Sequence, residues 1–144
     1  MRFPDTNVLI YTVNAADPHH GDSCAWMREC LADARGIGMA WIVLVGFLRL
    51  TTHPRILPSP LPIETALSVV DEWLCHPHVR IVHPGERHAG IFGRILLSLG
   101  TAGNLTNDAH LAALAIEHNA EVGTFDRDFK RFLGVRCQLL GPTA

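Results

Sequence analysis

The 144-residue chain is predicted to adopt an α/β fold, with a central parallel sheet flanked by helices on both faces. Short apolar runs alternate along the sequence with longer segments whose apolar residues recur at helical spacing, and this alternation is typical of parallel sheets crossed by helices. The length, with 48% apolar and 18% charged residues, fits one continuous core. We therefore expect residues 1–144 to form a single domain, built as a three-layer sandwich.

The first strand is expected at Met1 to Asp5, where it ends in a carboxylate. The apolar run from Val8 to Asn14 fits either a short helix or an extension of that strand. A longer helix is expected next, with Asp17 as its N-cap and Pro18 at its first position, and Gly36 ends this pattern. The second element thus remains open, whereas the third is predicted to be helical.

The middle of the chain predicts a brief strand at Ile37 to Met39 and two helices separated by a loop. Residues Trp41 to Leu50 are apolar nearly all round, as in a helix that is buried on most of its surface. The segment His53 to Pro62 contains four prolines and is therefore expected to be a loop. Apolar residues then recur at helical spacing from Ile63 to Leu74, opposite polar ones, which predicts an amphipathic helix.

The second half of the chain continues the alternation of strands and helices. A glycine at 100 ends one apolar helical pattern, and the following helix begins near Thr106 or Asn107, with a body that is apolar on all sides. Strands are expected at 79–82, 121–124 and 135–140, and helices at 91–99 and from 106 or 107 to 116.

Composition limits the classes of function. The formal net charge of −2 gives no global attraction to nucleic acid or anionic membranes, so any site for a polyanion must be local. The longest apolar stretch, Met39 to Leu48, is shorter than the ~20 residues that a membrane helix needs, and no secretory signal is recognisable, so we expect a cytoplasmic protein without a membrane partner. The four cysteines lack a CxxC pair and are expected to be reduced thiols.

Three aspartates stand where the chain leaves the predicted sheet or enters a buried helix: Asp5, Asp126 and Asp108. The carboxyl ends of parallel strands meet in one crevice, so these side chains are expected to converge. Carboxylates placed together repel one another unless a hard cation such as Mg²⁺ or Mn²⁺ neutralises them, and metal-dependent nucleases use this arrangement. Alternatively, Asp5 is a turn residue and the other two are helix caps.

Polar and basic residues surround these aspartates. Thr6, Asn7 and Thr124 could orient the carboxylates or a metal-bound water from a second layer around the metal, or they could serve ordinary turn chemistry. A group of basic residues near the last acid could contact RNA phosphates or form a solvated face. These residues are Arg127, Lys130, Arg131 and Arg136.

Four segments form a combination of motifs that spans nearly the whole chain. They are F-P-D-T-N-V-L-I-Y at 3–11, W-I-V-L-V-G-F-L-R-L-T-T-H-P-R at 41–55, N-D-A-H-L-A-A-L-A-I-E-H at 107–118 and T-F-D-R-D-F at 124–129. In this order and separation they resemble the PIN-domain ribonucleases, specifically the VapC-type toxins of bacterial toxin–antitoxin pairs.

This resemblance implies a PIN-like sandwich and an endoribonuclease that hydrolyses RNA with Mg²⁺ or Mn²⁺. It places the acidic positions of the family at Asp5, Asp108 and Asp126, as catalytic residues and metal ligands. It also implies a small cognate antitoxin protein as inhibitor and a homodimer. An apolar patch for these partners is expected beside the proline-rich loop, with core burial as the alternative, at Phe47, Leu50, Ile56 and Leu57.

One position departs from the family pattern. The residue before the F-L-R segment is usually Glu in that family, whereas here it is Gly46, and nothing from Trp41 to Thr52 is acidic. Asp128 is the nearest replacement, although it also fits a surface residue or a local cap. A catalytically weakened PIN-like domain that binds RNA or antitoxin without cleaving is therefore the alternative function.

A phosphoacceptor receiver domain has a similar length and alternation of elements. It would need a pair of acids at the end of the first strand and an aspartate on a middle strand. The chain has a lone Asp5 and no aspartate from Val79 to Val82, which disfavours this class.

Overall fold

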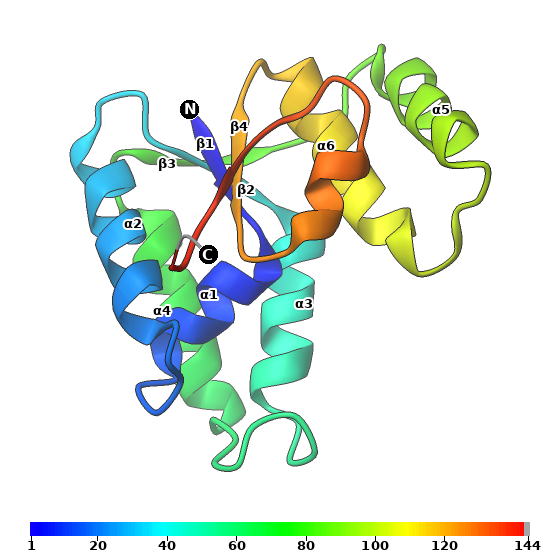
Figure 1. The fold of residues 1–144 in the computed structure, drawn as a ribbon. Coiled ribbons are helices and arrows are strands. Elements are labelled where there is room, and N and C mark those ends of the chain that lie inside the picture. Colours follow the sequence, from blue (N-terminus) through cyan, green and yellow to red (C-terminus); the bar gives the residue numbers. More distant parts are fainter. Residues whose placement is uncertain (143–144) are drawn as a thin grey trace.

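The computed structural model describes residues 1–142, in which a five-stranded parallel sheet has the order β3-β2-β1-β4-β5 (Figure 1). All four neighbouring pairs are parallel. The strands are β1 (Arg2–Pro4), β2 (Ile37–Ala40), β3 (Val79–Val82), β4 (Glu121–Thr124) and β5 (Arg136–Leu139). The predicted α/β class with a parallel sheet is confirmed.

Helices lie on both sides of this sheet. In Figure 1, α1 to α4 gather together, whereas α5 and α6 form a pair elsewhere on the sheet. The helices are α1 (Thr6–Val13), α2 (His20–Ala32), α3 (Trp41–Thr51), α4 (Ile63–Cys75), α5 (His88–Leu99) and α6 (Thr106–Glu117), with short 3₁₀ turns η1 (Gly103–Leu105) and η2 (Arg127–Arg131). Within residues 1–142, none of the helices combines the length and apolarity that crossing a membrane requires.

The element after β1 is a helix, which resolves the alternative left open by the sequence. It begins directly after Asp5, two residues earlier than the apolar run indicates. The predicted cap of the next helix is wrong, because α2 begins at His20 and not after Asp17. The Asp17 side chain instead accepts a 2.8 Å hydrogen bond from the His19 backbone and so caps the preceding turn.

Helix α3 is exposed along one stripe, at Trp41, Val45 and Arg49, and its other residues are buried or half-buried, which fits the predicted burial on most of its surface. Leu44 and Phe47 are fully buried, whereas Trp41 and Val45 are 47% and 57% exposed. The predicted apolar patch is divided: Phe47 and Leu57 are buried, as the core alternative expected, Leu50 is half-buried and Ile56 is exposed. An exposed apolar surface therefore exists on α3, but on the side opposite Phe47.

The four cysteines are free thiols, as expected, although only Cys30 is buried. The thiol at Cys30 has a pKa raised to about 11, chiefly because burial disfavours the thiolate. A group with this pKa is inert at neutral pH.

The pairing of β1 with β4 determines where the acidic side chains emerge. Pro4 lies opposite Gly123 in the ladder, and the next backbone bond runs from the Asp5 N–H to the Gly123 carbonyl at 2.9 Å. Asp5 and Thr124 therefore leave the sheet side by side, at the carboxyl ends of two adjacent strands.

Candidate active site

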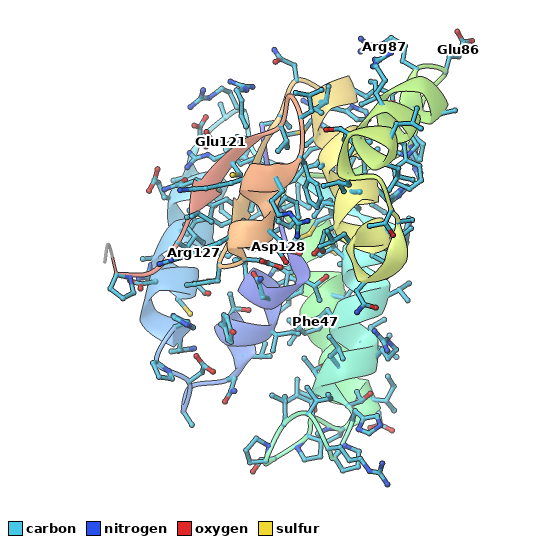
Figure 2. All side chains as sticks on the ribbon, turned by 45° about the vertical axis from the view of Figure 1, so that its right-hand side comes forward. Phe47, Glu86, Arg87, Glu121, Arg127 and Asp128 are labelled. Carbon is cyan, nitrogen blue, oxygen red and sulfur yellow. The ribbon has the colours of Figure 1, made fainter. Side chains whose placement is uncertain are left out.

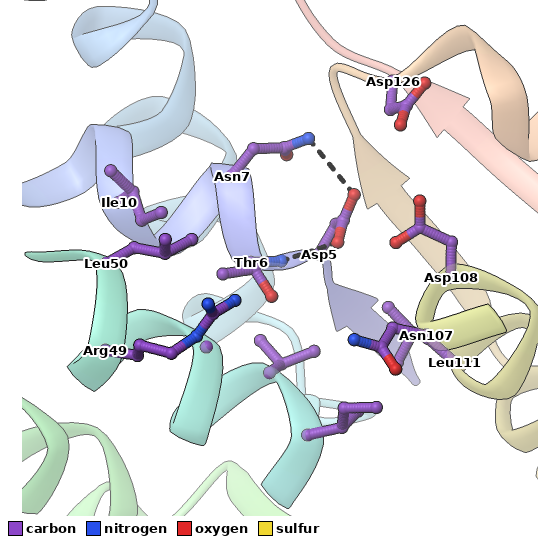
Figure 3. A pocket seen from close by; sticks show the side chains of 13 residues that line it. Asp5, Thr6, Asn7, Ile10, Arg49, Leu50, Asn107, Asp108, Leu111 and Asp126 are labelled. Atoms are coloured by element: carbon purple, nitrogen blue, oxygen red, sulfur yellow. Dashed lines mark hydrogen bonds between the residues drawn. The ribbon is translucent and has the colours of Figure 1, made fainter. Parts of the chain in front are cut away.

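A hollow of about 280 Å³ opens at the carboxyl ends of β1 and β4. Residues of α1, α3, α6 and the turn after β4 line it, and Figure 3 shows three aspartates on one side of it. The lining residues are Asp5, Thr6, Asn7, Ile10, Ile42, Val43, Gly46, Arg49, Leu50, Asn107, Asp108, Leu111 and Asp126. The predicted convergence of the three aspartates thus occurs in one hollow.

Asp5 is the most buried of these acids, with 5% of its surface exposed. It caps α1, since its Oδ1 accepts a 2.7 Å bond from the Thr6 N–H. Its Oδ2 accepts bonds from the Thr124 hydroxyl at 2.7 Å and from the Asn7 amide at 3.1 Å. A carboxylate offers about four acceptor positions, so these three donors hold the group in one orientation and leave part of its capacity free.

Asp108 lies in the first turn of α6, as predicted. The predicted capping is wrong, however, because the helix begins at Thr106 and neither Thr106 nor Asn107 caps it. The Thr106 hydroxyl instead donates to the Gly103 carbonyl at 2.7 Å. Burial, followed by the nearby charges of Asp5, Asp126 and Asp128, raises the pKa of Asp108 to about 7.

Asp126 belongs both to this hollow and to the turn that follows β4. Its Oδ1 accepts a 2.8 Å bond from the Asp128 N–H and caps η2, while its own N–H donates to the Thr124 hydroxyl at 2.9 Å. Asp126 therefore has both predicted roles: it caps the following turn, and it lies in the same hollow as Asp5 and Asp108. Asp128 is about half exposed and stands 3.7 Å from an Arg131 nitrogen, outside the lining of the hollow.

The pKa of Asp5 is raised as well. Burial is the main cause and the charge of Asp126 adds to it, while the hydrogen bonds from Thr124, Thr6 and Asn7 oppose the rise. Burial and mutual repulsion therefore act against negative charge in this hollow. A bound cation would relieve both effects.

The donor set suits a hard divalent cation. Mg²⁺ is commonly held by one or two carboxylates while it keeps several waters, and oxygen ligands also suit Mn²⁺. Across residues 1–142, no three His, Cys, Asp or Glu side chains are already close enough together to ligate one ion. The chemistry of the site thus fits such a cation, with water as part of its coordination.

A comparison with known families assigns the chain. The PIN domain family model matches residues 2–134. This chain belongs to the PIN-domain family. Among curated relatives, this PIN domain is 47% identical to Ribonuclease VapC37 and 40% identical to Ribonuclease VapC33, both from Mycobacterium tuberculosis, over 94% of its length. The matches cover 94% and 95% of those proteins, so the kinship extends over whole chains and places this PIN domain among the VapC proteins.

Solved structures agree on the fold. The VapBC2 complex of Rickettsia felis, bound to a DNA fragment from its promoter, contains a chain with a TM-score of 0.71 at 21% identity, covering 97% of this PIN domain and 98% of that chain. VapC20 of M. tuberculosis, described as a sarcin–ricin loop cleaving toxin, gives a TM-score of 0.65 at 21% identity, with 94% and 99% covered.

Gly46 faces the hollow of this PIN domain, on the side of α3 that approaches α1. A Cβ at this position would lie 3.1 Å from the Thr6 Cγ2 and 3.2 Å from the Thr6 Oγ1, which is closer than side chains usually tolerate. Glycine therefore lets α3 pack closely against the start of α1. The family's usual Glu is thus replaced by a glycine at a point of close packing between α3 and α1, and this packing was not visible in the sequence.

Arg49 and Asn107 also line the hollow; neither was predicted as a site residue, and Asn107 was expected only as a possible cap of α6. Arg49 is the one basic residue of this lining, and its side chain comes from the same face of α3 as Gly46, three residues earlier. The i,i+3 spacing was the available signal, since such residues share a helix face.

The predicted basic group divides into separate locations. Arg127 and Lys130 are exposed on η2, whereas Arg131 pairs with Asp128. Arg136 lies at the opposite end of the sheet, where it donates to the Asn119 carbonyl at 2.9 Å, so its predicted place beside the acidic cluster is wrong.

Proposed function

We propose that this PIN domain is an endoribonuclease, the toxin component of a toxin–antitoxin pair, and that it hydrolyses RNA phosphodiester bonds in the cytoplasm. The observation that carries the proposal is the convergence of Asp5, Asp108 and Asp126 from three separate elements in one hollow. The kinship with VapC ribonucleases supports the same conclusion. The match over residues 2–134 supports treating the chain as one functional domain.

Asp5, Asp108 and Asp126 would hold Mg²⁺ or Mn²⁺, with Asp128 near enough to add negative charge. The chemistry that such an ion supplies is activation of a water and neutralisation of charge on a phosphate oxygen. Thr124 and Asn7 keep the Asp5 carboxylate oriented through the bonds at its Oδ2, and the Thr6 N–H holds its Oδ1. These three residues are positioning residues, because they act through Asp5.

Asp108 has a separate role that follows from its pKa of about 7. At neutral pH in the absence of a cation, a substantial fraction of this carboxyl is protonated, so a cation competes with a proton for it. Loss of the proton from Asp108 is thus coupled to binding of the cation. We expect activity to fall as the pH is lowered below neutrality.

The test of this function is cleavage of RNA by the purified, antitoxin-free chain with Mn²⁺ or Mg²⁺. Asp5→Asn and Asp108→Asn are expected to abolish cleavage while circular dichroism shows a folded protein. Asp71→Asn, on the exposed face of α4, is the matched control and should leave cleavage unchanged. Cleavage that survives Asp5→Asn, or that persists in a chelator, would contradict the proposed centre.

A second candidate function is supported by Gly46. Without the acid that the family usually carries at this position, the centre lacks one carboxylate, and a domain that binds RNA or antitoxin without cleaving is the alternative. Retention of RNA by the wild-type chain, with no fragments produced at saturating Mn²⁺, would favour this alternative.

A small antitoxin protein and a second copy of the chain are the proposed protein partners. The related solved complexes are VapBC assemblies, which supports an antitoxin. For the homodimer, the exposed Trp41 and Val45 stand one turn apart on α3 and share a face. Light scattering should report a dimer for the wild-type chain and a monomer for Val45→Glu. A monomeric wild-type chain would exclude the homodimer.

A further inference from the structure

A second hollow, of about 420 Å³, lies beside the turn that carries Asp126. Phe125 and Arg127, the two chain neighbours of Asp126, both line it, and Lys130 of η2 adds a second positive charge. Figure 2 shows Arg127 near the end of β5, whereas Asp128 lies over α1. One short turn therefore separates a cationic hollow from the acidic one.

Phe125 is part of an aromatic group that spans distant parts of the chain. Its ring meets Tyr11 edge-on, with centroids 5.1 Å apart, and the His19 ring lies 4.5 Å away. Its backbone N–H donates to the Asn7 Oδ1 at 3.4 Å, and the same Asn7 donates to Asp5. Phe125 therefore packs against Tyr11 and His19 and is connected to the acidic cluster through Asn7.

Phe125 is half-buried and lines the hollow, and Gly141 places no side chain over its ring. A Cβ at Gly141 would lie 3.5 Å from the Cδ1 and Cε1 atoms of the ring and would cover that part of it. The φ of Gly141 is +102°, a conformation that side-chain-bearing residues rarely adopt. The backbone thus passes beside the aromatic ring without placing a side chain on it.

The two cations of this hollow have no anionic partner among residues 1–142. Within residues 1–142, neither Arg127 nor Lys130 makes a salt bridge or a side-chain hydrogen bond. Arg131, on the same 3₁₀ turn, is instead paired with Asp128. The unpaired charges are therefore those that face the hollow beside Phe125.

We propose that this second hollow binds a nucleotide of single-stranded RNA next to the bond that is cleaved, an inference that rests on the proposed function. Its base stacks on Phe125, and its phosphate pairs with Arg127 and Lys130. Aromatic rings flanked by basic side chains are the usual means of holding unpaired nucleotides. The acidic cluster repels the RNA backbone, so a cationic subsite beside it supplies the attraction that positions the strand.

Binding is tested separately from cleavage, with a short fluorescent single-stranded RNA and the full chain in EDTA. Phe125→Leu should weaken binding about fivefold or more, while Phe125→Tyr, which retains an aromatic face, should bind like wild type. The double variant Arg127→Gln, Lys130→Gln should reduce the slope of log affinity against log salt by about 1.4, or about 0.7 for each phosphate charge that is no longer neutralised. Arg131→Gln, which removes one neighbouring positive charge that is already paired with Asp128, is the control and should leave the slope unchanged.

The outcomes separate this subsite from the proposed function. Equal effects of the Arg131 variant and the double variant, unchanged binding by Phe125→Leu, or absence of RNA binding by the wild-type chain in EDTA would each overturn the subsite. Cleavage with Mn²⁺ is measured independently. RNA bound through Phe125 and Arg127 but never cleaved would overturn the nuclease and leave the subsite standing.

Discussion

The hydroxyl of Thr124 donates a 2.7 Å hydrogen bond to the Oδ2 of Asp5, joining residues 119 positions apart in the sequence. The same hydroxyl oxygen accepts the N–H of Asp126 at 2.9 Å. Thr124 is fully buried, so both bonds are shielded from water. One side chain thus links two of the three aspartates and fixes their separation.

Replacing this hydroxyl should weaken both stability and catalysis. Thr124→Val keeps the shape of the side chain but leaves a buried carboxylate oxygen and a backbone N–H with one partner fewer, so we expect a loss of about 2 kcal/mol in denaturant unfolding. The Thr124 bond lowers the pKa of Asp5, so its removal should shift the acidic limb of the cleavage profile to higher pH. Thr124→Ser retains the donor and should leave that limb in place. A Val variant with an unchanged limb would contradict the linkage.

The raised pKa of Asp108 predicts how the stability of the metal-free protein depends on pH. A carboxyl with a pKa of about 7 when folded and about 3.9 when unfolded binds protons more tightly in the folded state. Asp108 therefore does not destabilise the folded protein below about pH 4. Its destabilising effect grows as the pH rises and is complete above about pH 7. Asp108→Asn should accordingly stabilise the protein at pH 8 in EDTA, by at most about 4 kcal/mol, and have little effect at pH 4.

Thermal unfolding across this pH range measures the difference between the two proteins. Mn²⁺ at pH 8 should raise the melting temperature of the wild-type chain more than that of Asp108→Asn, because the ion relieves a repulsion that the variant lacks. Equal stability of the two proteins at pH 8 would show that Asp108 ionises normally.

The close approach of Gly46 to Thr6 predicts a coupling between the two positions. Gly46→Ala alone should gain none of the ~1 kcal/mol that replacing a helical glycine usually yields, because the new Cβ presses on the Thr6 side chain. In a Thr6→Ala background, both close contacts are absent and the gain should appear. A double-mutant cycle from urea unfolding measures this coupling, and additive effects would show that Thr6 moves aside at no cost.

Metal affinity should be low in the wild-type chain, because three carboxylates leave more of the coordination sphere to water. We expect Mn²⁺ to support cleavage at least as well as Mg²⁺, since it binds such sites more tightly and accepts looser geometry. Gly46→Glu in the Thr6→Ala background should tighten Mn²⁺ binding measured by calorimetry, since position 46 faces the hollow. Gly46→Gln has the same size without the charge and is the control; equal affinities of the two would refute the missing-carboxylate explanation.

Much of the fold could be read from local patterns. The strands at 79–82 and 121–124 have the predicted bounds, and the amphipathic helix from Ile63 ends one residue after its predicted last apolar position. These elements follow from side-chain periodicity, which neighbours in the chain determine. Helix starts were less accurate: His20 rather than Asp17 opens α2, because the turn before the helix uses the Asp17 carboxylate for its own hydrogen bond.

The acidic cluster was predictable for a topological reason. Parallel strands deliver their carboxyl ends to one edge, so the acids that follow β1 and β4 lie at that edge, and Asp108 joins them from the first turn of α6. Sequence alone therefore determined the α/β class, the alternation of elements and the three aspartates that were expected to meet. Each of these depends on local order along the chain or on a rule that holds for all such sheets.

Only the tertiary structure decided which neighbours those residues have. The adjacency of β1 and β4 brings the Thr124 hydroxyl to Asp5, the approach of α3 to α1 explains why Gly46 fits against Thr6, and Tyr11 meets Phe125. These pairs are far apart in the sequence, and each depends on strand order and helix packing to within a few ångströms. Local sequence patterns do not determine positions to within a few ångströms, because these positions arise from the simultaneous packing of the whole core.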